Sequence, residues 1–277
     1  MLGERHITKV VRGMPASDGA GVRLTRVIGQ PALANLDPFL LLDEFGSDRP
    51  DDYLAGFPPH PHRGFETVTY MLDGAMRHQD SLGNTGHLGP GSVQWMTAGR
   101  GIIHSEMPEQ EDGLMRGFQL WVNLPAEHKM TAPRYQDIPA SSIAVVEEVG
   151  VLVRVITGAY QGVRGPVHTP HIDGLYLDVQ LEAGATVRVS IPDGHAGFTY
   201  AFEGSVGAGD TVLAKGDLGV LGGDGVVVLR GGEAGGRALV VAGRPLREPI
   251  VQRGPFVMNT ADEIRQAIRD YHAGRLA

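Results

Sequence analysis

The chain has 277 residues, 42% of them apolar, with a formal net charge of −8 and no cysteine. This length predicts about two domains of ordinary size, and the lack of cysteine excludes disulfides and thiolate metal ligands and fits a reducing cytoplasm. The negative charge argues against direct nucleic-acid binding. No apolar run reaches the roughly 18 residues that a membrane span needs, and no signal peptide is visible, so we expect a cytoplasmic protein that does not enter a membrane.

Short apolar runs separated by turns predict an all-β protein, and the 40 glycines and 18 prolines fit such turns. Residues 5–36 predict two or three strands, and the run PFLLLDEF that follows Asp37 predicts a buried strand. From Gly64 onward apolar residues alternate with period two, and the pattern returns at residues 93–96 and 117–124. The intervening glycine-rich segments predict the turns of antiparallel sheets.

The second half predicts a separate domain and one helix. Residues 126–140 are polar and contain proline, so we expect domains at 1–130 and 146–277, joined by a linker at 131–145. Thr260 and Glu263 have the spacing of a capping box, and the apolar residues that follow recur with helical period. This pattern predicts a short helix near the C-terminus.

The stretch from Gly56 to Pro108 carries two pairs of candidate metal ligands. His60 and His62 are two residues apart, and about forty residues later His104 and Glu106 repeat that spacing. Residues i and i+2 on a strand face the same side, so paired strands could bring three imidazoles and one carboxylate to one point. Such a ligand set suits Fe, Mn, Co, Ni, Cu or Zn. The alternative, polar strand residues at a wet barrel mouth, does not account for the paired spacing.

The same segments resemble the pirin family of the cupin superfamily. The matching text is HPHRGFETVTY and QWMTAGRGIIHSEMP, with DPFLLLDEFG and GFQLWVNLP on either side. The resemblance implies a bicupin, that is, two antiparallel β-barrel (jelly-roll) domains packed face to face, here with a short C-terminal helix. It also implies Fe(2+) as the metal, held by His60, His62, His104 and Glu106, with Glu66 in a supporting or structural role.

Pirins resemble quercetin 2,3-dioxygenases, which open the heterocycle of a flavonol with O2. On this hypothesis Glu106 is both a metal ligand and the catalytic base, and an apolar mouth containing Phe57, Phe65 and Met107 holds a flat aromatic substrate. The alternative is an iron-dependent, redox-sensitive regulatory protein that binds a protein partner, as a transcriptional cofactor or as a modulator of a metabolic enzyme. A cavity of flavonol size would favour the enzyme, whereas a closed pocket would favour the regulator.

An internal repeat predicts that only one barrel keeps the metal site. TVTYMLDG at 67–74 matches GFTYAFEG at 197–204, and PGSVQWM at 90–96 resembles KGDLGVL at 215–221. In this register the four ligands correspond to residues that cannot bind a metal: Ser190, Pro192, Leu229 and Gly231. We therefore expect one metal ion per chain. His78 and His87, between the two motifs, are expected to be surface residues of a hairpin.

Overall fold

The computed structural model describes residues 3–277, which form two compact units. The histidine unit, named for His60, His62 and His104, comprises residues 15–29, 39–140 and 246–277. The aliphatic unit, named for the side chains of its core, comprises residues 3–14, 30–38 and 141–245. All strand pairs between the named strands of the described residues are antiparallel. The expected all-β bicupin with one short C-terminal helix is confirmed.

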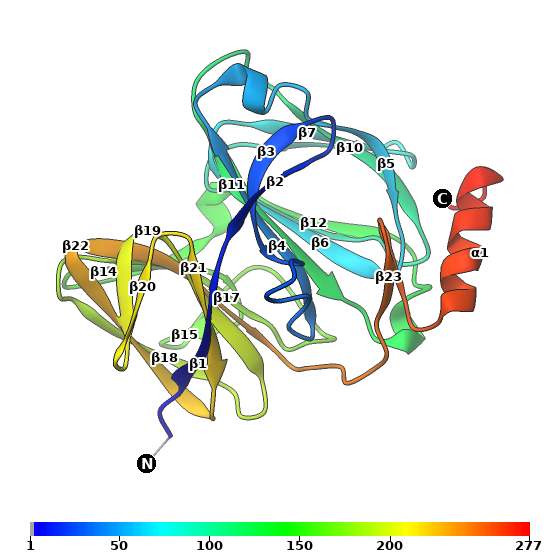
Figure 1. Cartoon of the computed structure of the whole chain (residues 1–277). Coiled ribbons are helices and arrows are strands. Elements are labelled where there is room, and N and C mark those ends of the chain that lie inside the picture. Colours follow the sequence, from blue (N-terminus) through cyan, green and yellow to red (C-terminus); the bar gives the residue numbers. More distant parts are fainter. Residues whose placement is uncertain (1–2) are drawn as a thin grey trace. The chain divides into compact units, whose positions relative to one another are not determined.

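The histidine unit contains a seven-stranded and a four-stranded sheet (Figure 1). The seven-stranded sheet has the order β12-β9-β6-β11-β4-β3-β2, and the four-stranded sheet has the order β5-β10-β7-β8. The strands of both sheets are β2 (Met14–Asp18), β3 (Val22–Ile28), β4 (Phe39–Ser47), β5 (Phe57–His62), β6 (Phe65–Asp73), β7 (Met76–Asp80), β8 (Thr85–Leu88), β9 (Val93–Thr97), β10 (Ile102–Pro108), β11 (Met115–Asn123) and β12 (Arg134–Ile138).

The register of β6 against β11 determines which side chains reach the interior of the histidine unit. Thr69 lies opposite Gln119, and the next pair along the ladder is Val68 and Leu120. Because successive residues of a strand point to opposite faces, Thr69 and Gln119 share one face and the two apolar residues share the other. The polar pair contacts Glu106 of β10. The alternating sequence therefore puts polar groups on the face that meets the candidate metal site.

The C-terminal segment completes the histidine unit. It forms the hairpin of β23 (Val251–Arg253) and β24 (Phe256–Met258) and the helix α1 (Ala261–His272). Thr260 caps the helix through the expected capping box with Glu263. Apolar residues of β24 and α1 pack into one cluster with Ile103 of β10. The tail thus packs against the strand that carries His104 and Glu106.

The aliphatic unit is built around a nine-stranded sheet. Its longest strand, β22 (Gly225–Gly243), pairs with β17, β18 and β19. The other strands are β1 (His6–Arg12), β13 (Ala144–Glu148), β14 (Val151–Thr157), β15 (Ala159–Tyr160), β16 (Val163–Arg164), β17 (Leu175–Leu181), β18 (Thr186–Ile191), β19 (Ala196–Ala208), β20 (Thr211–Ala214) and β21 (Asp217–Gly222). The core consists mainly of valine, leucine, isoleucine and alanine.

The contacts divide the chain differently from the expected ranges 1–130, 131–145 and 146–277. Strand β1 pairs with β21 and so joins the aliphatic unit, whereas residues 246–277 join the histidine unit. Within the expected linker, β12 pairs with β9. That segment is polar because β12 is an edge strand, and polar residues on an edge discourage further pairing. None of the helices in the described part of the chain is long and apolar enough to cross a membrane.

Candidate metal centre

Strands β5 and β10 bring three histidines together, as the spacing predicted. In the β5–β10 register His104 lies opposite His60, and Ile102 lies opposite His62. The ring centroids are 4.7 Å apart for His60 and His62, 4.4 Å for His60 and His104, and 4.9 Å for His62 and His104. One ring nitrogen of each residue lies within 4.8 Å of the others. This three-histidine cluster could hold a metal ion.

The hydrogen bonds around the cluster leave nitrogen lone pairs available to a cation. His60 Nδ1 lies 2.8 Å from the Pro58 carbonyl, which can only accept, so Nδ1 carries the proton and Nε2 keeps its lone pair. This Nε2 lies 3.0 Å from His62 Nε2. His104 Nε2 is buried without a hydrogen-bond partner among the described residues. A metal ion would satisfy these nitrogens, so the residues fit such an ion.

Burial keeps two of these imidazoles neutral. Desolvation is the main cause that lowers the pKa of His62 well below its usual value, and repulsion from His60 adds to it. The pKa of His104 is lowered by burial first and then by the neighbouring histidines. Neutral imidazole is the form that binds metals. His62 and His104 are therefore in the protonation state that can bind a metal cation.

Glu106 lies on β10 two residues after His104 and is 3% exposed. Its Oε1 accepts a hydrogen bond of 2.8 Å from Thr69 Oγ1, and its Oε2 accepts one of 3.0 Å from Gln119 Nε2. Both donors come from the opposite sheet. The carboxylate is thus fixed beside the cluster, although it is not among the groups within 4.8 Å of one another. Its coordination of the metal stays a prediction.

A cavity of about 580 Å³ opens onto the site. His60, His62 and Glu106 lie in its wall, and exposed residues at Gly19, Ala20 and the two prolines before His60 form part of its rim. Its apolar wall contains Leu24, Leu41, Phe45, Phe57 and Trp121. Of the three expected substrate residues, Phe57 lines the cavity, whereas Phe65 and Met107 do not. Phe65 instead packs against His62 and Trp121, with ring-centroid distances of 5.1 and 4.4 Å.

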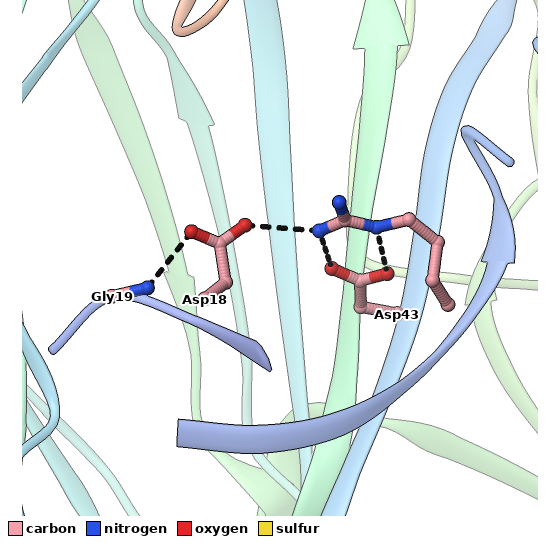
Figure 2. Close-up of polar contacts among 4 residues, drawn as sticks. Asp18, Gly19 and Asp43 are labelled. Carbon is pink, nitrogen blue, oxygen red and sulfur yellow. Dashed lines mark hydrogen bonds and ion pairs between the residues drawn. The ribbon is translucent and has the colours of Figure 1, made fainter. Parts of the chain in front are cut away.

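The cavity also contains a charged group that the sequence analysis did not identify. Arg26 donates to Asp43 through Nε at 3.0 Å and Nη2 at 2.7 Å, and to Asp18 through Nη2 at 2.9 Å. Figure 2 shows the guanidinium between the carboxylates of Asp18 and Asp43. Burial raises the pKa of Asp43, and the hydrogen bonds from Arg26 oppose this rise. No sequence motif links these residues, because β2, β3 and β4 bring them together.

The C-terminal segment holds the strand that follows the first histidine pair. Arg63 is buried, donates to the Arg100 carbonyl, and pairs with Asp270 of α1 at 2.8 Å. Lys129 is 1% exposed and donates to the Gly64 and Val257 carbonyls at 2.7 and 3.1 Å. Arg63 does not line the cavity. Its observed partners give it a structural role.

The structure also places Glu66 and His78, both of which are buried. Glu66 is buried and accepts a 2.6 Å hydrogen bond from Thr97, away from the cavity, in agreement with a structural role. His78, expected at the surface, is 1% exposed and its Nδ1 lies 3.3 Å from His104 Nδ1. The expectation failed because the glycine-rich turn begins only after β7. The signal in the sequence was the alternation of Met76 and His78 with Arg77 and Gln79, which matches the alternating burial of β7.

The aliphatic unit has no comparable site in the part of the chain that the structure describes. The three-histidine cluster is the one group of metal-binding side chains found among residues 3–277. Ser190 is exposed, and its neighbours Val189 and Ile191 point into the apolar core with Leu229. The interior of this unit is filled by aliphatic packing.

Comparisons with known proteins point to the same family along nearly the whole chain. Residues 21–122 match the Pirin family, and residues 176–277 match the Pirin C-terminal cupin domain. A Pseudomonas aeruginosa protein named "Putative quercetin 2,3-dioxygenase" is 54% identical over 99% of this chain and 98% of its own length. Human pirin is 46% identical over 98% of this chain and 93% of its own length. A crystal structure of quercetin 2,3-dioxygenase from Acinetobacter baumannii has a TM-score of 0.92, with 35% identity and 99% of both chains covered.

Proposed function

This chain belongs to the pirin family, and we propose that it is a metal-dependent dioxygenase that cleaves the heterocycle of a flavonol with O2. The observation that carries the proposal is the cavity: it joins an apolar, aromatic wall to the three-histidine cluster and to Glu106. Its volume of about 580 Å³ falls within the range of about 300–1,000 Å³ that is typical of small-molecule sites. The names of the relatives support the same reaction.

Glu106 is the residue that we propose to bind the metal and to take the substrate's hydroxyl proton. Thr69 and Gln119 each donate to one of its oxygens, which orients the carboxylate and still leaves lone pairs on both oxygens. A base held in a fixed orientation loses little freedom when the proton moves. Glu106 therefore lies in the cavity wall, is buried, and is held in one orientation, as a general base requires.

The cavity wall selects a flat and largely apolar molecule. Phe57 and Trp121 present aromatic surface, and burial of apolar area there contributes about 25 cal/mol per Å². Arg26 is already paired with two carboxylates, so the polar side of the cavity offers balanced hydrogen-bonding groups rather than a net positive charge. This arrangement suits phenolic hydroxyls better than a phosphate or a polycarboxylate.

We propose that His60, His62, His104 and Glu106 hold the ion, with iron(II) as the expected metal and Mn, Co, Ni, Cu and Zn as alternatives. A bound ion would lower the pKa of the substrate hydroxyl and promote electron transfer to dioxygen. The protein's own part is to exclude water with the apolar wall and to position Glu106. No thiolate ligand is available, because the chain contains no cysteine.

Substitution of Glu106 by glutamine tests this proposal. Glu106→Gln keeps the shape of the side chain but removes the anionic donor and the proton acceptor. Flavonol-dependent dioxygen consumption should fall about 10²-fold or more, compared at equal metal content. A metal-replete Glu106→Gln variant with the turnover of the parent would show that Glu106 is not the base.

The regulatory alternative makes a different prediction for the parent protein. If the parent consumes no dioxygen with any flavonol under iron, manganese, nickel or copper loading, the enzymatic proposal fails and a role in binding a partner protein replaces it. The open cavity favours the enzyme, because a regulator that acts through its surface does not need an apolar cavity at the metal site.

A further inference from the structure

Behind the three-histidine cluster lies a chain of hydrogen bonds that the reaction itself does not use. His104 Nδ1 lies 3.3 Å from His78 Nδ1, and His78 Nε2 lies 3.1 Å from the Tyr135 hydroxyl. Burial, and then the neighbouring Asp80 carboxylate, raises the pKa of the Tyr135 hydroxyl, which therefore stays protonated. The chain of hydrogen bonds runs from β10 through β7 to β12. It joins a candidate metal ligand to an edge strand of the other sheet.

The unpartnered nitrogen of His104 orders the protons along this chain. His104 Nε2 is buried without a partner among the described residues, and as a metal ligand it carries the lone pair, so Nδ1 carries the proton and donates to His78 Nδ1. His78 then carries its own proton on Nε2 and donates it to the Tyr135 oxygen. In this arrangement both nitrogens of His104 and both nitrogens of His78 have partners once the ion is bound.

We propose that His78 and Tyr135 are positioning residues of the metal centre, which hold His104 in the tautomer and ring orientation that direct its Nε2 lone pair at the ion. The inference rests on the metal site of the proposed function, but not on flavonol as its substrate. Loss of a residue that hydrogen-bonds to a metal ligand commonly weakens metal binding by about 10- to 100-fold. Neither residue touches the substrate cavity.

The geometry excludes a simpler role for His78 as core packing. His78 lies opposite Glu106 in the β7–β10 register, and its ring centroid lies 5.0 Å from His104 and 4.9 Å from Tyr135. An apolar side chain could make no directed contact with either partner. The imidazole instead uses both of its nitrogens, each on a partner with a defined direction.

The tautomers can be measured directly in the metal-free protein. Two-bond ¹H–¹⁵N NMR spectra should show His104 protonated on Nδ1 and His78 protonated on Nε2. In Tyr135→Phe, which keeps the ring but removes the acceptor, His78 should lose its preference and His104 should become a mixture. A parent spectrum with His104 protonated on Nε2 would overturn the proposal.

Metal binding provides a second readout that does not depend on turnover. Titration with Co(II), followed through its visible absorption, should give a dissociation constant about 10- to 100-fold higher for Tyr135→Phe and His78→Leu than for the parent. His78→Gln, whose amide oxygen can still accept from His104, should recover part of the affinity. His87→Ala is the matched control: it changes an exposed histidine of the neighbouring strand and should bind like the parent.

The two tests separate this proposal from the proposed function. If Tyr135→Phe and His78→Leu bind Co(II) with the parent's affinity and spectrum, or if His87→Ala weakens binding equally, the positioning role is wrong. If the parent shows the expected tautomers and affinities but never oxidises a flavonol, the positioning role stands and the dioxygenase proposal falls.

Discussion

Lys129 shows how a single buried charge supports the site from outside it. Its ammonium group donates to the Gly64 carbonyl, the Asn123 side chain and the Val257 carbonyl at 2.7, 2.7 and 3.1 Å. These acceptors belong to the segment after His62, the end of β11 and β24. The residue thus joins the C-terminal segment to the strands of the histidine unit. Burial lowers the pKa of Lys129 to about 8.

This pKa predicts a rise in stability with pH. Between about pH 8 and the usual value of 10.5 the unfolded chain keeps the lysine proton and the folded protein has lost it. The unfolded state then binds more protons, so the free energy of unfolding should increase, by about 3 kcal/mol over the whole window. Urea unfolding at pH 8, 9 and 10 should show this rise. Lys129→Met should be less stable and lack the rise, and an equal slope in both proteins would contradict the assignment.

The local sequence predicted the three-histidine cluster but not the residues around it. His60, His62 and His104 were identifiable because i, i+2 spacing on a strand has a direct geometric meaning. The partners of Glu106 lie 37 and 13 residues away on two other strands, and only the strand register brings them together. His78 was assigned to the surface because turn residues nearby outweighed the alternation of a five-residue strand.

Among the elements, β1 and the C-terminal segment determine which residues complete each unit. Six residues of β1 are in register with β21, from His6 opposite Gly222 to Arg12 opposite Asp217. Arg5 adds hydrogen bonds of 3.0 Å to the carbonyls of Pro192 and His195. The order of segments along the chain could not predict that β1 joins the aliphatic unit, because pairing between residues about 200 positions apart leaves no local pattern.

Removal of residues 1–12 should therefore affect the aliphatic unit alone. Without β1, amides of β21 that face it should exchange rapidly with deuterium, as followed by mass spectrometry. Strand β10 should remain protected and Co(II) should bind with unchanged affinity, because the candidate metal ligands lie in the other unit. Loss of protection in β10 with retention in β21 would contradict this division of the chain. Deletion of residues 260–277 is the complementary control and should affect β10 through its contact with the tail.

At the scale of the whole molecule, two cupin domains are present and their interiors differ. Histidines and a cavity lie in the histidine unit, whereas the described part of the aliphatic unit has an aliphatic core. The repeat of TVTYMLDG as GFTYAFEG predicted the second domain, because strand alternation survives when other residues change. One metal ion per chain stays a prediction. The cavity volume and the Arg26 pairings were not predictable, since they depend on loops and strands distant in the chain.

The most direct test of the account is a single-turnover reaction of protein whose metal content has been measured. Elemental analysis should give one ion per chain, and an anaerobic flavonol titration should saturate at one flavonol per ion. Admission of limiting dioxygen should then consume flavonol and dioxygen in equal amounts. The variant His104→Ala, which removes a proposed ligand and should lose the metal, should consume neither. Two ions per chain, or a flavonol complex that persists unchanged in air with every metal tested, would contradict the account.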